Sequence, residues 1–177
     1  MLTFERTWQD RRDRIAVQID QLIVAGWTAR DDAAVQHHIE ELGALGIPGP
    51  STWPLFYRLG VTQLTQVEHL QVLGPDTSGE GEPVLVSLAD GLWVTLGSDH
   101  TDRKAEAMGV ALSKQLCSKV LGTRLWRFDE VAPHWDRLVL RAWATIDGKR
   151  VLYQEGAAAA IRNPQDPMPR CTGPASP

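Results

Sequence analysis

Two Asp-Gly pairs, each set between runs rich in branched apolar residues, place the strongest constraint on the fold of this chain. Asp90-Gly91 separates "EGEPVLVSLA" from "LWVTLGSD", and Asp147-Gly148 separates "WDRLVLRAWATI" from "KRVLYQEG". Asp-Gly favours the tight turn of a β-hairpin because both residues tolerate positive φ angles. The sequence therefore predicts two antiparallel hairpins and a fold in which β-structure dominates.

The rest of the chain adds strands and one clear helix. The runs "LTFER", "RIAVQIDQLIVAG" and "VEHLQVLG" are typical of strands. A helix is predicted within "TARDDAAVQHHIEELGALG", where Thr28 and Asp31 fit a capping box and Gly46 and Pro48 follow the last turn. Strand–helix alternation is too sparse for a parallel α/β sheet, so we expect an α+β fold that is mainly β.

The length and the end of the chain suggest one domain with a tail. A chain of 177 residues fits a single domain, which we place at residues 1–162. Residues 163–177, "NPQDPMPRCTGPASP", hold five prolines and no apolar period, so we expect this tail to be disordered.

Composition excludes several classes of protein. With a net charge of −4, nucleic acid and anionic membrane surfaces are not expected partners. No apolar run approaches the ~20 residues of a membrane span, and the polar start does not resemble an export signal. Cys117 and Cys171 lie far apart without metal-site spacing, so a disulfide framework is not expected and a cytoplasmic location is the default.

The first hairpin brings acidic residues together. A two-residue turn at Asp90-Gly91 would pair Glu82 with Asp99 and place Glu80 on the same face. Directly opposed like charges destabilise a sheet, and a divalent cation would offset their repulsion. Carboxylates alone suit Mg²⁺, Mn²⁺ or Ca²⁺. The alternative is a group of solvated acidic side chains that holds no ion.

A second candidate lies on the predicted helix. His38 and Glu41 are three residues apart and therefore share one side of the helix, whereas His37 points elsewhere. A carboxylate that holds one imidazole nitrogen raises the basicity of the other, as in an oriented general base. The alternative is an ordinary exposed pair without a function.

Taken together, these motifs resemble the fumarylacetoacetate hydrolase superfamily over roughly residues 20–160, and within it an uncharacterised prokaryotic branch described as a domain of unknown function. That superfamily carries His-x-x-Glu before a proline-rich loop, matched here by "HIEELGALGIPGPSTWPLFYR" with His38 and Glu41. It then carries a Glu-x-Glu pair of metal ligands, matched by Glu80 and Glu82.

The third shared motif is similar to Asn-Asp-x-Ser-x-Arg, and "SDHTDR" supplies Asp99 and Arg103. A lysine follows some twenty positions later in the superfamily, and Lys119 or Lys114 would fill that place. The order of the three motifs gives the resemblance its specificity.

The resemblance implies a mixed β-roll or barrel, commonly a homodimer, that binds Mg²⁺ or Mn²⁺ through Glu80, Glu82 and Asp99. Members hydrolyse, decarboxylate, hydrate or dehydrate small 2-oxo acids or 1,3-dicarbonyl compounds, with an enolate stabilised by the metal. His38 with Glu41 would be the base, Lys119 or Lys114 would stabilise negative charge, and substrate contacts would come from three further residues, Arg103, Tyr57 and Arg58.

The chain also departs from that superfamily. Ser98 stands where the asparagine is expected, a short hairpin replaces a longer segment between Glu82 and Asp99, and the proline-rich end stands where further strands are expected. An alternative function is therefore that of a catalytically silent, truncated member that binds or assembles. A third is a structural Ca²⁺ site.

Overall fold

The computed structural model describes residues 1–44 and 49–165 of the chain. Its strands are β1 (Leu2–Trp8), β2 (Arg11–Val17), β3 (Leu22–Gly26), β4 (Leu55–Leu59), β5 (Leu64–Thr65), β6 (Gly81–Leu88), β7 (Gly91–Ser98), β8 (Lys119–Leu121), β9 (Arg124–Arg127), β10 (Val139–Ile146) and β11 (Lys149–Ala157). Its α-helices are α1 (Asp32–Ala44), α2 (Arg103–Glu106), α3 (Val110–Gln115) and α4 (Phe128–Val131), and its 3-10 turns are η1 (Val61–Gln63), η2 (Ala132–Arg137) and η3 (Ala158–Ala160).

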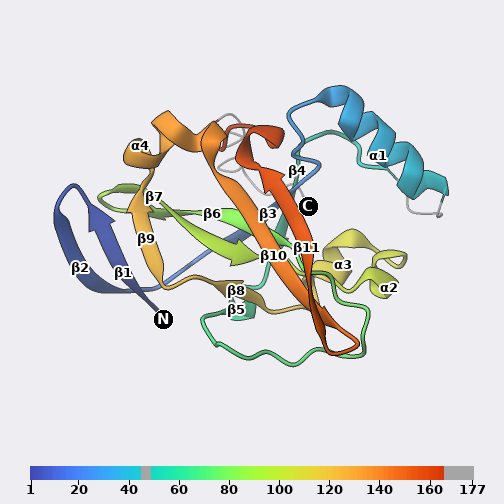
Figure 1. Ribbon diagram of the computed structural model, residues 1–177, viewed down its shortest axis with the longest axis horizontal. Coiled ribbons are helices and arrows are strands. Elements are labelled where there is room, and N and C mark those ends of the chain that lie inside the picture. The colour runs from blue at the N-terminus through green and yellow to red at the C-terminus, as the bar shows by residue number, and fades with distance from the viewer. Residues whose placement is uncertain (45–48, 166–177) are drawn as a thin grey trace.

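A seven-stranded mixed sheet forms the body of the molecule, with β7 near its centre (Figure 1). One edge of β7 pairs with β6 along its whole length, and the other pairs with β9 near its start and with β8 near its end. The pairs β1–β9 and β5–β8 are parallel, whereas the hairpins are antiparallel. The prediction of a mainly β fold is confirmed.

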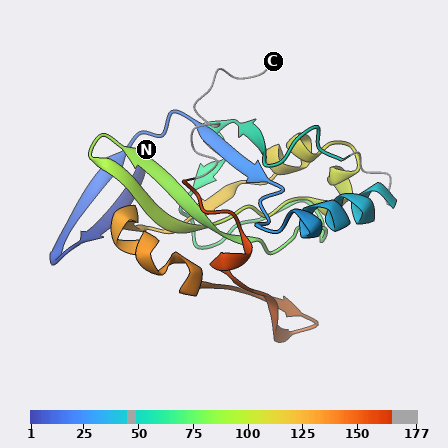
Figure 2. The same cartoon turned by 90° about the horizontal axis from the view of Figure 1, so that it is seen from above.

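Two small sheets, β3–β4 and β10–β11, complete the fold. Figure 2 shows the tip of the β10–β11 hairpin extending away from the body. The strand predicted at residues 67–74 is wrong: those residues form bends and irregular backbone, because the run finds no buried face and Leu73 stays 90% exposed.

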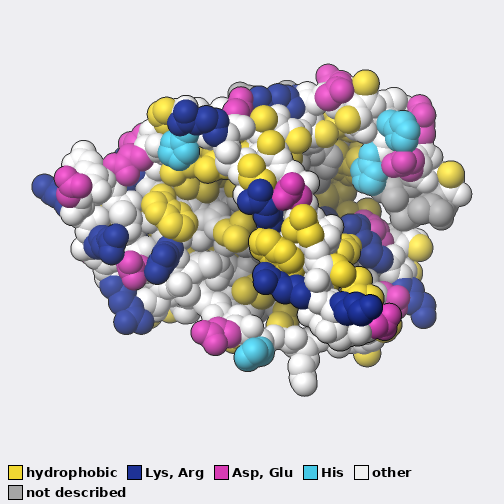
Figure 3. Space-filling model, viewed as in Figure 1, with side chains coloured by type: hydrophobic (Ala, Val, Ile, Leu, Met, Phe, Trp, Pro, Cys, Tyr) yellow, Lys and Arg dark blue, Asp and Glu magenta, His cyan; other side chains and the backbone are white. Residues whose placement is uncertain are grey.

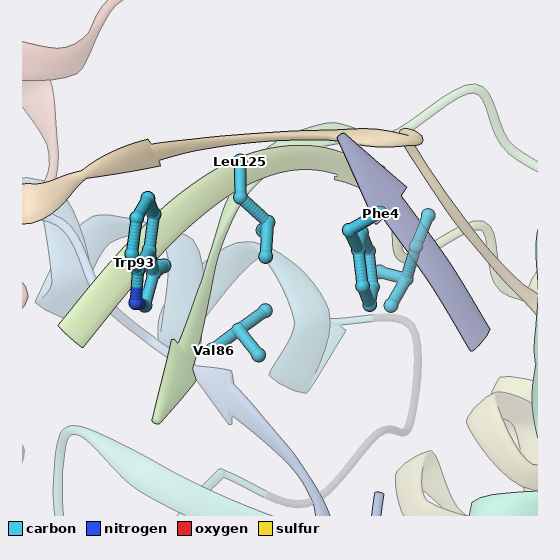
Figure 4. Close-up of a cluster of buried hydrophobic side chains, with 5 residues drawn as sticks. Phe4, Val86, Trp93 and Leu125 are labelled. Atoms are coloured by element: carbon cyan, nitrogen blue, oxygen red, sulfur yellow. The ribbon is translucent and has the colours of Figure 1, made fainter. Parts of the chain in front are cut away.

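The core packs on both faces of β7. Trp93 is buried with Phe4, Val86 and Leu125 on one face, where the four side chains converge (Figure 4). Its neighbour Val94 points to the other face and packs with a second buried cluster of Phe128, Trp135 and Ala158. Since successive strand residues point to opposite faces, one strand can serve both clusters.

The second Asp-Gly pair forms the predicted turn. Ile146 pairs with Lys149, and Asp147 and Gly148 between them have φ angles of 50° and 74°. Two successive positive φ angles define the type I′ hairpin turn that Asp-Gly favours.

The first Asp-Gly pair forms a hairpin in a different register. Leu88 pairs with Gly91, so the turn residues are Ala89 and Asp90, and Glu82 lies opposite Gly97 instead of Asp99. Asp90 is held in the turn because its carboxylate accepts a hydrogen bond from Trp93 Nε1 at 3.0 Å. The displacement is two residues, which changes partners but keeps every side chain on its predicted face.

Helix α1 begins one residue after Asp31. The Asp31 carboxylate accepts a hydrogen bond from the Ala33 N–H at 2.9 Å, so Asp31 is the cap and the capping box with Thr28 is wrong. Thr28 instead contributes its carbonyl to Arg162 N–H at 2.8 Å. The predicted helix stop at Gly46 and Pro48 lies outside the described residues, as does the predicted tail from residue 166 onward.

The segment before α1 contacts the segment after β11. Ala29 forms a β-bridge with Ile161, which ties these two segments together.

In residues 1–44 and 49–165, no helix is long and apolar enough to cross a membrane.

Candidate functional site

The open end of the β6–β7 hairpin gathers three carboxylates. Glu80 precedes β6, Glu82 lies within it, and Asp99 follows β7. One oxygen of each lies within 4.8 Å of the others, and the Asp99 N–H donates to the Glu80 carbonyl at 2.9 Å. The predicted proximity of the three acids is thus confirmed, because the displaced register preserves the face on which they stand.

Asp99 is the most enclosed of the three. Its side chain is 7% exposed and ion-paired with Lys114 and Lys119, both of which are buried. Lys119 Nζ lies 2.9 Å from Asp99 Oδ1 and donates to the His100 carbonyl at 2.7 Å. Asp99 Oδ1 nevertheless makes no well-aligned hydrogen bond with the residues described, so it retains capacity for a further electropositive partner.

Lys114 is held in its charged form. Burial opposes the charge, but attraction to Asp99 and a hydrogen bond to it outweigh burial and raise the pKa of Lys114 above its usual range. The expected choice between Lys114 and Lys119 does not arise, because α3 and β8 bring both ammonium groups to the same carboxylate.

Glu80 faces a different cation. Its carboxylate is paired with Arg103, whose guanidinium also donates to Glu106 at 2.9 Å. Arg103 is thus at the cluster, as predicted, and lies on α2 directly after the hairpin.

Glu82 is the acid with the fewest stabilising contacts among the described residues. In the described part of the chain, no hydrogen bond or ion pair reaches its side chain. Burial, followed by repulsion from Asp99, raises the pKa of Glu82 to about 7, although Lys114 draws it back down. Near neutral pH the group therefore exists in both protonation states.

The acidic cluster carries less uncompensated negative charge than the sequence led us to expect. Arg103, Lys114 and Lys119 already supply positive charge to the cluster, so the repulsion is offset within the protein. The donor set still fits a hard divalent cation, because Glu82 and Asp99 Oδ1 keep unused acceptor capacity beside Glu80.

His38 and Glu41 lie on α1, at the rim of the molecule (Figure 1). His38 Nδ1 lies 3.5 Å from a Glu41 oxygen, and the ring packs on Trp27 with centroids 5.4 Å apart. His37 Nδ1 lies 3.4 Å from the same carboxylate, so the expectation that His37 points elsewhere is wrong: an i,i+4 spacing also brings side chains together. Within the described residues, no hydrogen bond or ion pair joins His38 or Glu41 to the acidic cluster.

Tyr57 and Arg58 lie on β4, not in a loop. Tyr57 is half-buried and its hydroxyl accepts a hydrogen bond from Trp27 Nε1 at 3.3 Å, whereas Arg58 is exposed. Because neighbouring strand residues point to opposite faces, the two side chains cannot both face one substrate.

A sequence profile described as "Protein of unknown function (DUF2848)" matches residues 25–175. The chain belongs to this family. No curated protein matches the sequence. The fold is similar to that of Cg1458, known from crystal structures, with a TM-score of 0.57 and 18% identity over 80% of this chain. The alignment covers 54% of Cg1458, so this chain spans about half of that protein.

Two residues at the site of this DUF2848 chain had no role assigned from the sequence. Thr101 is fully buried and its hydroxyl donates to the Asp99 carbonyl at 2.9 Å, while its N–H donates to the Ser78 hydroxyl at 3.0 Å. His100 is buried between the Thr77 hydroxyl, at 2.7 Å, and the Ser118 carbonyl, at 2.5 Å. Their position within the motif "SDHTDR" was the sequence signal that could have pointed to them.

Two further assignments follow from these contacts. Burial lowers the pKa of His100, and a neutral ring that donates from Nε2 to the Ser118 carbonyl fits both neighbours. Asp102 caps α2 by accepting from the Ala105 N–H at 2.8 Å, so it serves the helix.

Proposed function

We propose that this protein is a metal-dependent hydrolase or lyase that acts on a small 2-oxo acid or 1,3-dicarbonyl compound, with a fold of the fumarylacetoacetate hydrolase type. The observation that carries the proposal is the convergence of Glu80, Glu82 and Asp99 within 4.8 Å. Its specificity comes from the order of the three motifs along the sequence.

Glu80, Glu82 and Asp99 would hold Mg²⁺ or Mn²⁺, and Ca²⁺ suits the same oxygens. Such an ion would polarise the substrate oxygens as a Lewis acid. The protein's own cations have a separate task. Arg103 and Lys114 present positive charge at the cluster, where a substrate carboxylate or a developing oxyanion would be stabilised.

Lys119 differs from Lys114 in its surroundings. Its ammonium group is buried between Asp99 and the His100 carbonyl, which fixes its position. A preorganised cation needs little rearrangement when negative charge develops nearby. Lys119 would therefore act mainly by holding Asp99 in place and through the electrostatic field of its ammonium group.

His38 would be the base, with Glu41 orienting it through Nδ1. No described contact joins His38 to the acidic cluster, so this role would require substrate binding to bring the two together. Tyr57 or Arg58 would supply a substrate contact, one of the two at most.

The proposal is tested by assaying oxaloacetate and acylpyruvate turnover with Mn²⁺. We expect activity in the wild type and a loss of at least ~100-fold in His38→Ala and Glu82→Gln, the scale of a general base or an electrostatic group. His69→Ala, an exposed histidine outside the site, is the matched control and should retain activity. Turnover that Glu82→Gln leaves unchanged would contradict the proposal.

A catalytically silent binding or assembly protein is the second candidate. It is favoured by the charge balance, because three basic side chains already neutralise the cluster. Tight Mn²⁺ binding without turnover of a broad 2-oxo acid panel would select it. A structural Ca²⁺ site would instead show a melting temperature lowered by chelation with no change in any turnover.

A homodimer is part of the proposal, as is a cytoplasmic location. Figure 3 shows hydrophobic side chains over the β10–β11 hairpin, where Val139, Trp143 and Leu152 are each about half exposed. A two-stranded sheet is marginal alone, and its outward charges Arg141 and Glu155 already pair with each other, so a second copy could cover this face. Light scattering of wild type and Trp143→Ser should give dimer and monomer masses.

A further inference from the structure

We infer that Gln154 is a positioning residue that holds Glu80 and Glu82 in the orientation needed to bind a metal ion together. This inference rests on the proposed metal site and identifies a residue outside the acidic cluster on which the site depends.

One edge of β6 has no partner strand in the main sheet of the described residues. Among the strands of the described residues, β6 pairs with β7 alone, and Gly81 is its first residue. The Glu80 carbonyl points toward β7 and accepts from the Asp99 N–H at 2.9 Å. Because N–H and C=O groups alternate sides along a strand, the polar groups of Gly81 point away from β7 and need another partner.

Gln154 supplies both missing hydrogen bonds. Its Oε1 accepts from the Gly81 N–H at 2.8 Å, and its Nε2 donates to the Gly81 carbonyl at 3.1 Å. The side-chain amide thus takes the place of a neighbouring strand. The peptide groups on both sides of Gly81, which link it to Glu80 and Glu82, are clamped from the β7 side and from the β11 side.

A β-bulge directs Gln154 to this edge. In the hairpin, Trp143 pairs with Leu152 and Ala142 pairs with Gln154, which leaves Tyr153 as the extra residue. Without the extra residue, position 154 would lie opposite Arg141, whose side chain is on the exposed face. Bulges commonly re-aim a side chain in this way.

Small residues let β11 approach. A Cβ at Gly81 would lie 3.3 Å from Gln154 Oε1, and a Cβ at Gly79 would lie 3.0 Å from the Tyr153 ring. Two consecutive residues of β11 therefore meet the two glycines that flank Glu80. Figure 1 shows the β10–β11 hairpin crossing in front of β6.

The experiment measures Mn²⁺ affinity by calorimetry for wild type and Gln154→Met, which keeps the side-chain length but loses both hydrogen bonds. We expect the Kd to rise 10–100-fold, the usual effect of losing a partner that orients metal ligands. The electron paramagnetic resonance spectrum of the Mn²⁺ that still binds should also change, a signature that general destabilisation would not give. Gln36→Met is the matched control, since Gln36 is exposed on α1 and its amide donates to Glu40 of the same helix at 3.3 Å.

Gln154→Asn serves as a second variant, because it keeps the amide but is one methylene too short for the clamp. It should weaken binding to a similar extent and should fold even if Gln154→Met does not. Hydrogen exchange of residues 79–82 should accelerate in both variants while the rest of the sheet stays protected.

The outcomes separate the two proposals. Wild-type protein that binds no Mn²⁺ overturns the proposed metal site and, with it, the role of Gln154. Wild-type binding that Gln154→Met and Gln154→Asn leave within twofold overturns the role of Gln154 alone.

Discussion

At the scale of single residues, Glu82 is the least compensated charge in the cluster. Its neighbours Glu80 and Asp99 each have a basic partner, whereas the pKa of Glu82 rises to about 7 through burial and through repulsion from Asp99. A partly buried carboxylate without an ion pair is costly to ionise. Glu82 is therefore the acid on which the proposed cation would have the largest effect.

The raised pKa of Glu82 predicts how stability depends on pH without metal. Between pH 4.5 and about 7 the folded protein holds a proton that the unfolded chain releases, so the stability that this proton gives is present below pH 4.5 and is lost as pH rises through about 7. The contribution is on the order of 3 kcal/mol, as an upper figure. Urea unfolding in chelator from pH 4.5 to 8 measures it. Glu82→Gln should flatten this dependence, and an equally steep decline in that variant would refute the assignment.

Lys119 gives a second prediction at this scale. Lys119→Met leaves Asp99 with one cation in a buried setting, and breaking a buried ion pair costs about 3–5 kcal/mol. Denaturant unfolding at pH 7 measures the loss. Lys149→Met, at the exposed first residue of β11, should change stability by less than ~0.5 kcal/mol.

At the scale of elements, the β6–β7 hairpin is the part that builds the site. The sequence predicted the alternation along its strands, which placed the three acids on one face even though the turn was misassigned by one residue and the pairing register by two. The turn itself was not readable, because Arg6, from distant β1, bonds to Asp90 and thereby helps to select the register. Helix α1 was also predicted, because its apolar residues recur with the period of a helix. Its cap was misassigned, since Asp31 and not Thr28 caps the first turn.

Gly97 tests how tightly this hairpin is packed. A Cβ there would lie 2.6 Å from Val84 Cγ2 and 3.1 Å from Leu121 Cδ2. Gly97→Ala should therefore cost about 1–3 kcal/mol of unfolding free energy and weaken Mn²⁺ binding, since Gly97 lies opposite Glu82. Gly156→Ala, in β11 with nothing within 4 Å of the added Cβ, is the control and should be close to neutral. Equal stability of the two variants would contradict the close packing.

At the scale of the whole molecule, metal binding should stabilise the fold, because the ligands come from separate strands that unfolding would part. Mn²⁺ at 100 times its Kd should add about 2.7 kcal/mol, which raises the melting temperature by roughly 5–10 °C in a chain of this size. Differential scanning fluorimetry with Mn²⁺ and then chelator measures the change. Glu82→Gln should show a much smaller shift; a shift as large as that of the wild type would place the ion elsewhere.

The sequence by itself determined the β-rich character, both hairpins and the face shared by Glu80, Glu82 and Asp99. These properties depend on the period of two along a strand and on turn residues, and both act over a few positions. Only the tertiary structure decided how the acids are paired with other groups, including that both candidate lysines reach Asp99. Lys114 and Lys119 arrive from α3 and β8, and Gln154 arrives through a bulge in a hairpin more than fifty positions away. No local preference encodes such contacts, because they form only when separate elements pack together and bury one another's polar groups.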